Sequence, residues 1–236
     1  RSPSISQLPQ RVGSHARAGA RPVCFRAMLL LTEPAAAHVD PAEPLLAALR
    51  AATAERHRSI DTLFALERDA DLTRIAAVLR VFESFLRGWG PRLRACVPPV
   101  LQGWFDAGDR CALARQDLYA LSLAPRDDDA SASVALPDLA AALGSLYVIE
   151  GSALGGQVIA RRLREATRGG FDSRFFVGAG AAATAARWRT MRGLLRDAGL
   201  DQVGTTTACA AACATFDALA LAFRSELDAL STGAVA

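Results

Sequence analysis

The sequence predicts an all-α protein, in which a single-domain helical bundle follows a polar N-terminal segment. Apolar residues recur at intervals of three and four along most of the chain, and almost no stretch alternates with the period of two that marks a strand. Hydrophobic residues make up 51% of the 236 residues and charged residues 22%, so the chain can bury a core. We place the helical domain at residues 41–232 and expect six to eight helices.

The N-terminal segment, residues 1–40, is rich in Ser, Gly, Pro, Arg and Ala and has no helical or strand periodicity. Such a composition cannot bury enough apolar surface to offset the entropy lost on ordering. We therefore expect this segment to be disordered, or to be upstream sequence read from a misassigned start, since the first methionine is Met28. Its arginine-rich, acid-free beginning is also typical of a mitochondrial transit peptide.

The first two helices follow from the apolar pattern after this segment. Leucines, alanines and a threonine at intervals of three and four predict a helix over residues 44–68. Asp71 is a typical N-terminal cap, and an apolar stripe over residues 75–86 predicts the second helix. Glycines and a proline at residues 88–91 are expected to interrupt that helix.

The later elements are separated by prolines, glycines and one polar loop. A segment over residues 98–123 is expected to be helical in two pieces, and residues 125–133 read as the polar loop. A proline and an aspartate at residues 137–138 begin a long helix that we expect to reach residue 167. The apolar pattern predicts the last two helices at residues 181–198 and 205–230.

Charge, cysteine content and hydropathy exclude several classes of protein. Setting aside the five arginines that precede Glu33, the remaining 22 basic residues face 24 acidic ones, which gives no support to nucleic-acid binding. The five cysteines have no Cys-x-x-Cys spacing, which argues against disulfides or a zinc module and suits the cytoplasm. No uninterrupted apolar run approaches the roughly 20 residues of a membrane helix, so we expect no membrane segment.

Three other patterns do not support a function. Residues 175–177 are the only strand-like stretch, and the Gly-Ala-Gly at 178–180 lacks the parallel sheet that a dinucleotide fold requires. Cys209 and Cys213 lie among alanines on one helical face and are expected to be small buried residues. A di-iron bundle needs paired Glu-x-x-His motifs, whereas His57 is the only histidine in a predicted helix.

His57 and Asp61 lie four residues apart, so they share one face of the first helix. A carboxylate at this position can accept a hydrogen bond from one ring nitrogen and leave the other to bind a metal. A surface histidine with an ordinary helical neighbour has the same spacing, and the spacing alone does not decide between them.

Three glycines, Gly151, Gly155 and Gly156, interrupt a strong helical pattern over residues 144–159. Each glycine costs a helix about 1 kcal/mol relative to alanine, so their presence calls for a cause. Three causes would explain them: a kink in the helix, a close crossing by another helix, or a planar ligand against bare backbone. In the third case the ligand would lie between this helix and the helix that carries His57.

On these segments the chain resembles the biliverdin-forming heme oxygenases, especially the bacterial branch associated with bacteriophytochromes. Residues 52–57 resemble that family's proximal helix, whose histidine binds the heme iron, and residues 151–158 resemble its glycine-rich distal helix. Phe216 and Phe223 resemble its paired phenylalanines near the heme. The resemblance covers residues 43–230 and implies a bundle of the heme oxygenase type, with heme between the two helices.

The resemblance implies a role for each matching position. His57 would be the axial ligand of the iron, and Asp61 would orient its ring. Arginine suits a heme propionate because its fork matches a carboxylate. The other implied heme contacts are Arg50 and Arg189 at the propionates, with Arg187 or Arg192 as alternatives to Arg189, and Tyr147, Phe216 and Phe223.

The distal motif would supply the catalytic positions Gly151, Ser152, Gly155 and Gly156. Many family members carry an aspartate where this chain has Ser152, and that aspartate organises the waters that deliver protons to bound oxygen. A serine can hold a water but lacks the charge of a carboxylate. The departure puts the proton route in doubt.

The implied activity is oxidative cleavage of heme to biliverdin, carbon monoxide and free iron, with heme as both substrate and cofactor. O2 and external electrons would be required, and because no flavin or nicotinamide motif is present, a ferredoxin or flavoprotein reductase is the expected donor. A bacteriophytochrome could accept the biliverdin. The alternative is a non-catalytic heme-binding or heme-sequestering protein, and a third possibility is a fold relative with other chemistry.

Overall fold

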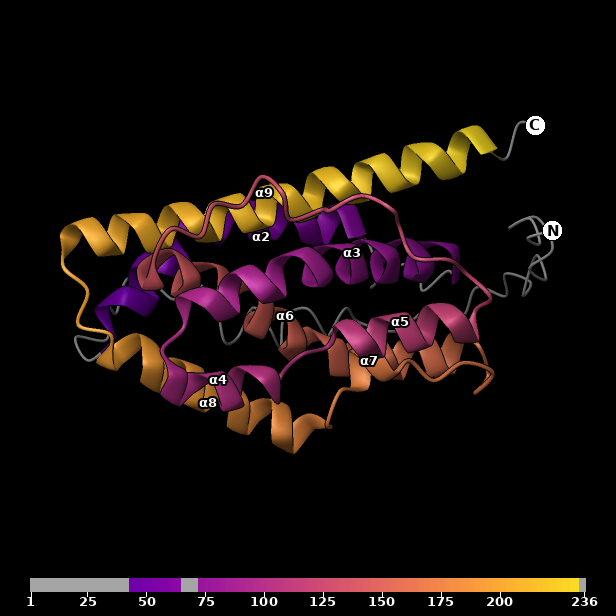
Figure 1. The fold of residues 1–236 in the computed structure, drawn as a ribbon. Coiled ribbons are helices and arrows are strands. Elements are labelled where there is room, and N and C mark those ends of the chain that lie inside the picture. The colour runs from indigo at the N-terminus through magenta and orange to yellow at the C-terminus, as the bar shows by residue number, and fades with distance from the viewer. Residues whose placement is uncertain (1–42, 65–71, 234–236) are drawn as a thin grey trace.

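Eight helices and no strand make up the regular structure in the residues that the computed structural model describes, 43–64 and 72–233, with side chains to residue 229. The prediction of an all-α fold is therefore confirmed for these ranges. The helices are α2 (Pro44–Phe64), α3 (Leu72–Cys96), α4 (Pro99–Asp106), α5 (Cys111–Ala120), α6 (Leu139–Ala166), α7 (Arg174–Val177), α8 (Ala181–Asp197) and α9 (Gln202–Gly233) (Figure 1). The predicted N-terminal segment, the cap at Asp71 and the predicted last turn at 65–68 lie outside the described residues.

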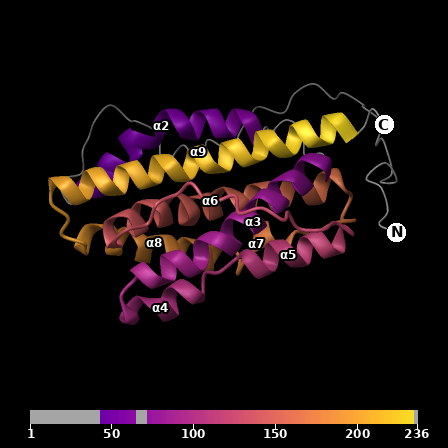
Figure 2. The ribbon, with the colours of Figure 1, turned by 45° about the horizontal axis from the view of Figure 1, so that its top comes forward.

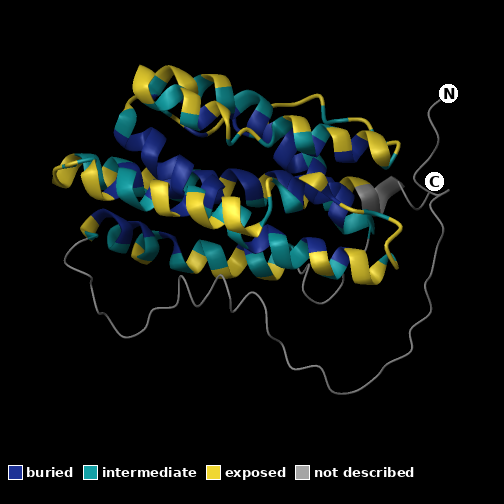
Figure 3. Ribbon diagram, turned by 90° about the horizontal axis from the view of Figure 1, so that it is seen from below, coloured by how far each residue is buried: buried dark blue, intermediate teal, exposed yellow. Residues whose placement is uncertain are grey.

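The long helices α6 and α9 pack against each other over much of their length, and α2 lies beside α9 (Figure 2). Helix α3 packs against α5 and α9, while α8 and α7 pack against α6. Buried residues gather on the inner faces of these helices and exposed residues on the outer faces (Figure 3). This arrangement brings α2 and α6, the two helices with the candidate motifs, into one core.

A glycine and a buried polar chain define where α6 meets its neighbours. A Cβ atom on Gly144 would lie 1.9 Å from the carbonyl oxygen of Ala208, so only glycine lets α9 approach this closely. Trp89 Nε1 donates to Ser145 Oγ at 2.8 Å, and Ser145 Oγ lies 2.7 Å from Thr215 Oγ1. The chain of hydrogen bonds ties α3, α6 and α9 together without unsatisfied hydroxyls.

Most predicted boundaries agree with the structure. Helices α4 and α5 are the two expected pieces of the 98–123 segment, and residues 125–133 contain no helix. Helix α6 begins where predicted, because Asp138 caps it by accepting a hydrogen bond from the backbone nitrogen of Ala141 at 2.9 Å.

One prediction about local structure was wrong, and one stretch with a strand-like sequence is helical. Helix α3 is not interrupted at residues 88–91 but continues through Pro91 to its end at Cys96. Trp89 and Leu93 are both buried in the core, so the packing of this stretch outweighs its weak helix propensity. The stretch at 175–177 belongs to the single helical turn α7 rather than to a strand.

The turn α7 is held by polar groups that cap its beginning. Ser173 Oγ accepts a hydrogen bond from the backbone nitrogen of Phe176 at 3.2 Å. The buried carboxylate of Asp117, from α5, accepts bonds from the backbone nitrogens of Arg174 and Phe175, each at 3.0 Å. These caps explain why a β-prone sequence forms a helical turn here.

Two helices among the described residues, α6 and the 202–229 part of α9, are long and apolar enough to cross a membrane by length and composition. Core helices of soluble bundles have the same properties, and 72% of the most apolar stretch of α6 is buried inside the molecule. The predicted cytoplasmic location, without a membrane segment, stays a prediction.

Candidate functional site

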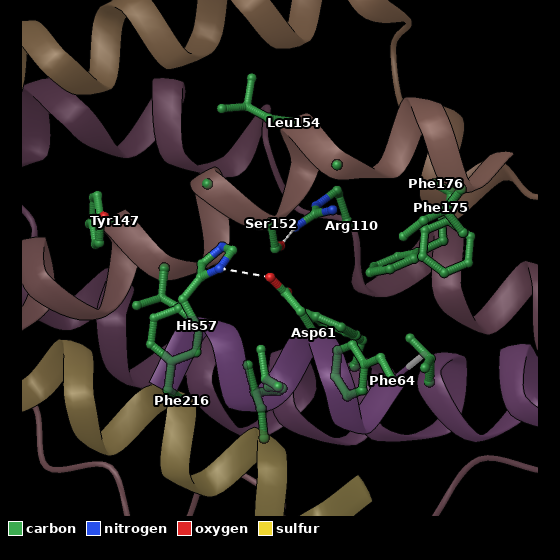
Figure 4. A pocket seen from close by; sticks show the side chains of 18 of the residues that line it. His57, Asp61, Phe64, Arg110, Tyr147, Ser152, Leu154, Phe175, Phe176 and Phe216 are labelled. Atoms are coloured by element: carbon green, nitrogen blue, oxygen red, sulfur yellow. Dashed lines mark hydrogen bonds and ion pairs between the residues drawn. The ribbon is translucent and has the colours of Figure 1, made fainter. Parts of the chain in front are cut away.

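A cavity lies between α2 and α6, with further walls from α3, α7, α8 and α9 (Figure 4). Its volume is about 880 Å³ including the space at its mouth, and its lining is mostly apolar. Small-molecule sites in proteins typically have similar linings. The cavity brings together seven of the predicted site residues: His57, Asp61, Tyr147, Gly151, Ser152, Gly155 and Phe216.

The pair His57–Asp61 forms the polar part of the α2 wall. His57 Nδ1 lies 2.9 Å from Asp61 Oδ2, and both side chains are mostly buried. The rings of His57 and Phe216 pack in a T-shaped arrangement, with 5.8 Å between the ring centroids. Burial raises the pKa of the Asp61 carboxyl, and the hydrogen bond with His57 acts in the opposite direction. Because Asp61 engages Nδ1, Nε2 is the nitrogen through which His57 would bind a metal.

On the α6 wall, Gly155 is buried and faces the cavity with bare backbone. Gly151 also lines the cavity, and a Cβ atom there would only touch the ring of Trp188, at 3.9 Å. Ser152 Oγ donates to the carbonyl oxygen of Ile149 at 2.7 Å. This wall therefore has two positions at which a ligand can approach the helix closely.

Gly156 has a different role from the other two glycines. It does not line the cavity, and a Cβ atom there would lie 2.7 Å from the carbonyl oxygen of Phe176. The next residue, Gln157, donates from Nε2 to the carbonyl oxygen of Val177 at 2.6 Å. Close contact with a neighbouring element therefore explains why residue 156 is a glycine. Gly155, in contrast, exposes its backbone to the cavity.

Arg110 is a cavity residue that the sequence analysis missed. It precedes α5, and its Nη2 donates to Ser152 Oγ at 2.8 Å and to the carbonyl oxygen of Ile149 at 2.9 Å. Its guanidinium carbon lies 4.8 Å from the ring centroid of Phe175. Burial lowers the pKa of Arg110 to about 10. The sequence contains no signal for this position, because Arg110 and Ser152 are 42 residues apart.

Arg50 and Arg189, the predicted propionate contacts, do not line the cavity. Arg189 is exposed on α8. Arg50 is partly buried, and its Nε atom is buried without a hydrogen-bond partner. Its charge lowers the pKa of the Tyr147 hydroxyl, as does a hydrogen bond with Thr53, although burial raises that pKa more strongly. Arg50 thus lies near the Tyr147 end of the cavity.

The alternative arginines on α8 are both engaged by carboxylates. Arg187 Nε and Nη2 donate to Glu150 at 2.7 and 2.8 Å, and Arg192 Nη2 lies 2.7 Å from Glu43. Phe223, the second predicted phenylalanine, is fully buried and packs against Phe64, with ring centroids 4.6 Å apart. Phe64 itself lines the cavity, so Phe223 lies one layer behind its wall.

The donor set of the cavity fits heme better than a bare ion. No cluster of three or more His, Cys, Asp or Glu residues suitable for a metal ion occurs in the described ranges. A heme needs only one axial ligand from the protein, because its macrocycle supplies the in-plane ligands. An oriented imidazole on one wall, glycine backbone on another and an apolar lining meet that need.

Comparison with known proteins gives no assignment for this chain. No family model matches the sequence, and no curated protein matches it. The functional hypothesis therefore depends on the cavity and its residues.

Proposed function

We propose that the protein binds heme in this cavity and cleaves it to biliverdin, carbon monoxide and iron, using O2 and electrons from an external donor. The observation that carries this proposal is the His57–Asp61 pair in an apolar cavity whose facing helix contributes Gly151 and Gly155. This combination is the one that the resemblance to heme oxygenases predicts. A cavity whose walls come from both α2 and α6 supports it further.

Heme binding would use apolar walls and one oriented ligand. The aromatic and aliphatic lining would take up the macrocycle and exclude water. His57 would bind the iron through Nε2, while Asp61 holds the ring in position and increases the basicity of the imidazole. Phe216 packs against the His57 ring and limits its rotation.

The polar ends of heme would require partners at the edge of the cavity. The buried Nε of Arg50 is a donor without an acceptor, and such a group costs free energy unless a ligand satisfies it. Arg50 does not line the cavity, so its side chain would have to turn toward the Tyr147 end for a propionate to supply that acceptor. Arg189, exposed on α8, remains a predicted contact for the second propionate.

When bound, heme supplies the iron that activates O2 and the ring that is cleaved. Gly155 lines the cavity without a side chain, and a larger residue there would extend into the space that bound heme and O2 would need. Ser152 Oγ donates its proton to Ile149 and accepts from Arg110, so its remaining lone pair could hold a water that passes protons into this space. A ferredoxin or flavoprotein reductase would supply electrons, and a bacteriophytochrome could take up the biliverdin.

A non-catalytic heme-binding protein is the second candidate function. Ser152 replaces the expected aspartate, and Asp61, the only carboxylate that lines the cavity among the described residues, is engaged by His57. A protein without a carboxylate for proton delivery could retain heme without cleaving it.

A hemin titration followed by reduction in air distinguishes these functions. The purified protein is loaded with hemin, monitored at the Soret band, and then given ascorbate or ferredoxin with its reductase, with catalase present to remove free peroxide. Loss of the Soret band with a red-absorbing pigment and one carbon monoxide per heme supports the oxygenase. A stable Soret band supports the binding protein, and absence of hemin binding overturns both.

A further inference from the structure

Arg110 reaches from the loop between α4 and α5 to the α6 wall of the cavity (Figure 4). Its two hydrogen bonds to Ile149 and Ser152 both come from Nη2. The remaining N–H groups of the guanidinium have no acceptor among the described residues. An arginine has five N–H donors in a planar fork, so most of this fork is available to a ligand.

Arg110 forms no salt bridge in the described part of the chain, where the nearby carboxylates of Glu150 and Glu83 pair with Arg187 and Arg115. Glu150, the acid with the largest influence on Arg110, is already paired in a bidentate manner with Arg187. Burial lowers the pKa of Arg110 to about 10, so the group is still protonated at neutral pH. Asp61, the carboxylate of the cavity lining in the described ranges, pairs with His57. A buried cation that forms no salt bridge attracts anions.

The surroundings of Arg110 hold its guanidinium in one position. The group stacks over the Phe175 ring, and Ser152 Oγ is both an acceptor for Nη2 and a donor to the α6 backbone. Donors that are fixed before a ligand arrives stabilise negative charge without reorganisation. The position of Ser152, three residues before Gly155 on the same helix, places this cation beside the bare backbone of the cavity wall.

We infer that Arg110 is the anion-binding group of the cavity: its guanidinium donates hydrogen bonds to a small anion on the face of heme that α6 covers, and Ser152 fixes its position. This inference rests on the proposed function. Negative charge develops on O2 as electrons are delivered, and Arg110 would stabilise that charge directly. The cavity would thus use a guanidinium at the place where Ser152 offers no carboxylate.

Azide binding to the ferric, hemin-loaded protein tests this inference without turnover. The spectrophotometric titration compares the unaltered chain with Arg110→Gln, Arg110→Lys and Ser152→Ala. The control is Arg164→Gln, on the same helix as Ser152, since Arg164 is exposed and pairs only with Asp172 at the surface. A second measurement is the infrared stretching frequency of carbon monoxide bound to the reduced protein, which falls next to a positive charge.

We expect Arg110→Gln to weaken azide binding about tenfold, the loss of one charged hydrogen bond, and to raise the carbon monoxide frequency. Arg110→Lys should retain part of the affinity, Ser152→Ala should lose a few-fold, and Arg164→Gln should be unchanged. If Arg110→Gln does not fold, Arg110→Lys provides the same comparison. If the Arg110 variants bind hemin with unchanged azide affinity and an unchanged carbon monoxide stretching frequency, this inference alone is overturned. If the unaltered chain does not bind hemin, the proposed function is overturned as well.

Discussion

Gly156 lies against the backbone of Phe176, so closely that an added Cβ atom would be 2.7 Å from the Phe176 carbonyl oxygen. Its neighbour Gly155 is buried at the cavity instead. Adjacent residues on a helix point about 100° apart, so they serve different surroundings. One glycine permits the contact between α6 and α7, and the other keeps the cavity wall free of a side chain.

Alanine substitutions at these two positions should therefore have opposite effects. Gly156→Ala forces the added methyl against a backbone carbonyl and should lower stability by about 1–3 kcal/mol. Gly155→Ala should leave stability unchanged or raise it by up to about 1 kcal/mol, because alanine favours the helix. In the hemin-loaded protein, Gly155→Ala should reduce the biliverdin yield per bound heme.

Thermal melting and single-turnover pigment yield, measured on both variants, check this pair of expectations. The sequence predicted a common catalytic role for Gly155 and Gly156, whereas the structure separates them. A normal yield in Gly155→Ala would remove that glycine from the candidate site.

The contact between α6 and α9 gives a second prediction. Gly144→Ala would bring the added Cβ to 1.9 Å from the Ala208 carbonyl oxygen, and backbone cannot yield as a flexible side chain does. We expect a loss of about 3 kcal/mol or more in the free energy of unfolding. Gly103→Ala on the exposed face of α4 is the control, because nothing lies within 4 Å of the added Cβ and stability should rise by up to about 1 kcal/mol. Urea unfolding measures both, and equal stability in the two variants would disprove the close approach.

His57→Ala should remove the axial ligand and leave the helices intact. His57 is partly exposed to the cavity, so the substitution leaves no large void in the core. The ferric, hemin-loaded variant should lose the spectrum of a histidine ligand, and added imidazole should restore it. Circular dichroism checks the fold, and an unchanged heme spectrum would reject the assignment.

Two further variants test the partner of His57 and a histidine outside the candidate site. Asp61→Asn should keep the ligand but weaken heme affinity about tenfold, the usual effect of losing the partner that orients a histidine. His38→Ala, in the N-terminal segment, should have no effect on the heme spectrum.

The parts of the site that sequence could predict depend on short separations along the chain. The spacing of four between His57 and Asp61 implies a contact on any helix, and Asp138 caps α6 from the adjacent position. Contacts between distant segments leave no such trace. The interaction of Arg110 with Ser152 follows from the way the α4–α5 loop packs on α6.

The departures from the local sequence pattern have the same origin. The turn α7 is helical because Asp117, 56 residues before Ser173, reaches its backbone nitrogens. Helix α3 passes through Pro91 because Trp89 and Leu93 are buried by other helices. Tertiary contacts outweighed local propensity in both cases.

The thiol of Cys111 should make the stability of the protein depend on pH in the alkaline range. Burial raises the pKa of Cys111 to about 11, and the charges of Glu83 and Asp109 act in the same direction. The folded protein then keeps a proton that the unfolded chain releases above about pH 8.5, so stability falls as the pH rises through this window. Burial also raises the pKa of the Cys209 thiol, so part of the alkaline loss remains in Cys111→Ala. We expect the unaltered chain to lose roughly 1–2 kcal/mol more than Cys111→Ala between pH 8 and pH 10.5. Urea unfolding of both proteins at the two pH values measures it, and identical losses would contradict the raised pKa.

Arg50 and Arg189 can be distinguished by a ligand without free propionates. The buried Nε of Arg50 lacks an acceptor, whereas Arg189 is exposed to solvent. Arg50→Gln should therefore weaken hemin binding about tenfold, and Arg189→Gln should change it by less than about twofold, since exposed charge pairs contribute little. Hemin dimethyl ester, which cannot accept a charged hydrogen bond through a carboxylate, should bind about tenfold more weakly than hemin to the unaltered chain. Arg50→Gln should abolish that preference. Equal affinities for hemin and its ester in the unaltered chain would exclude a propionate at Arg50 and would require the heme to enter the cavity in another orientation.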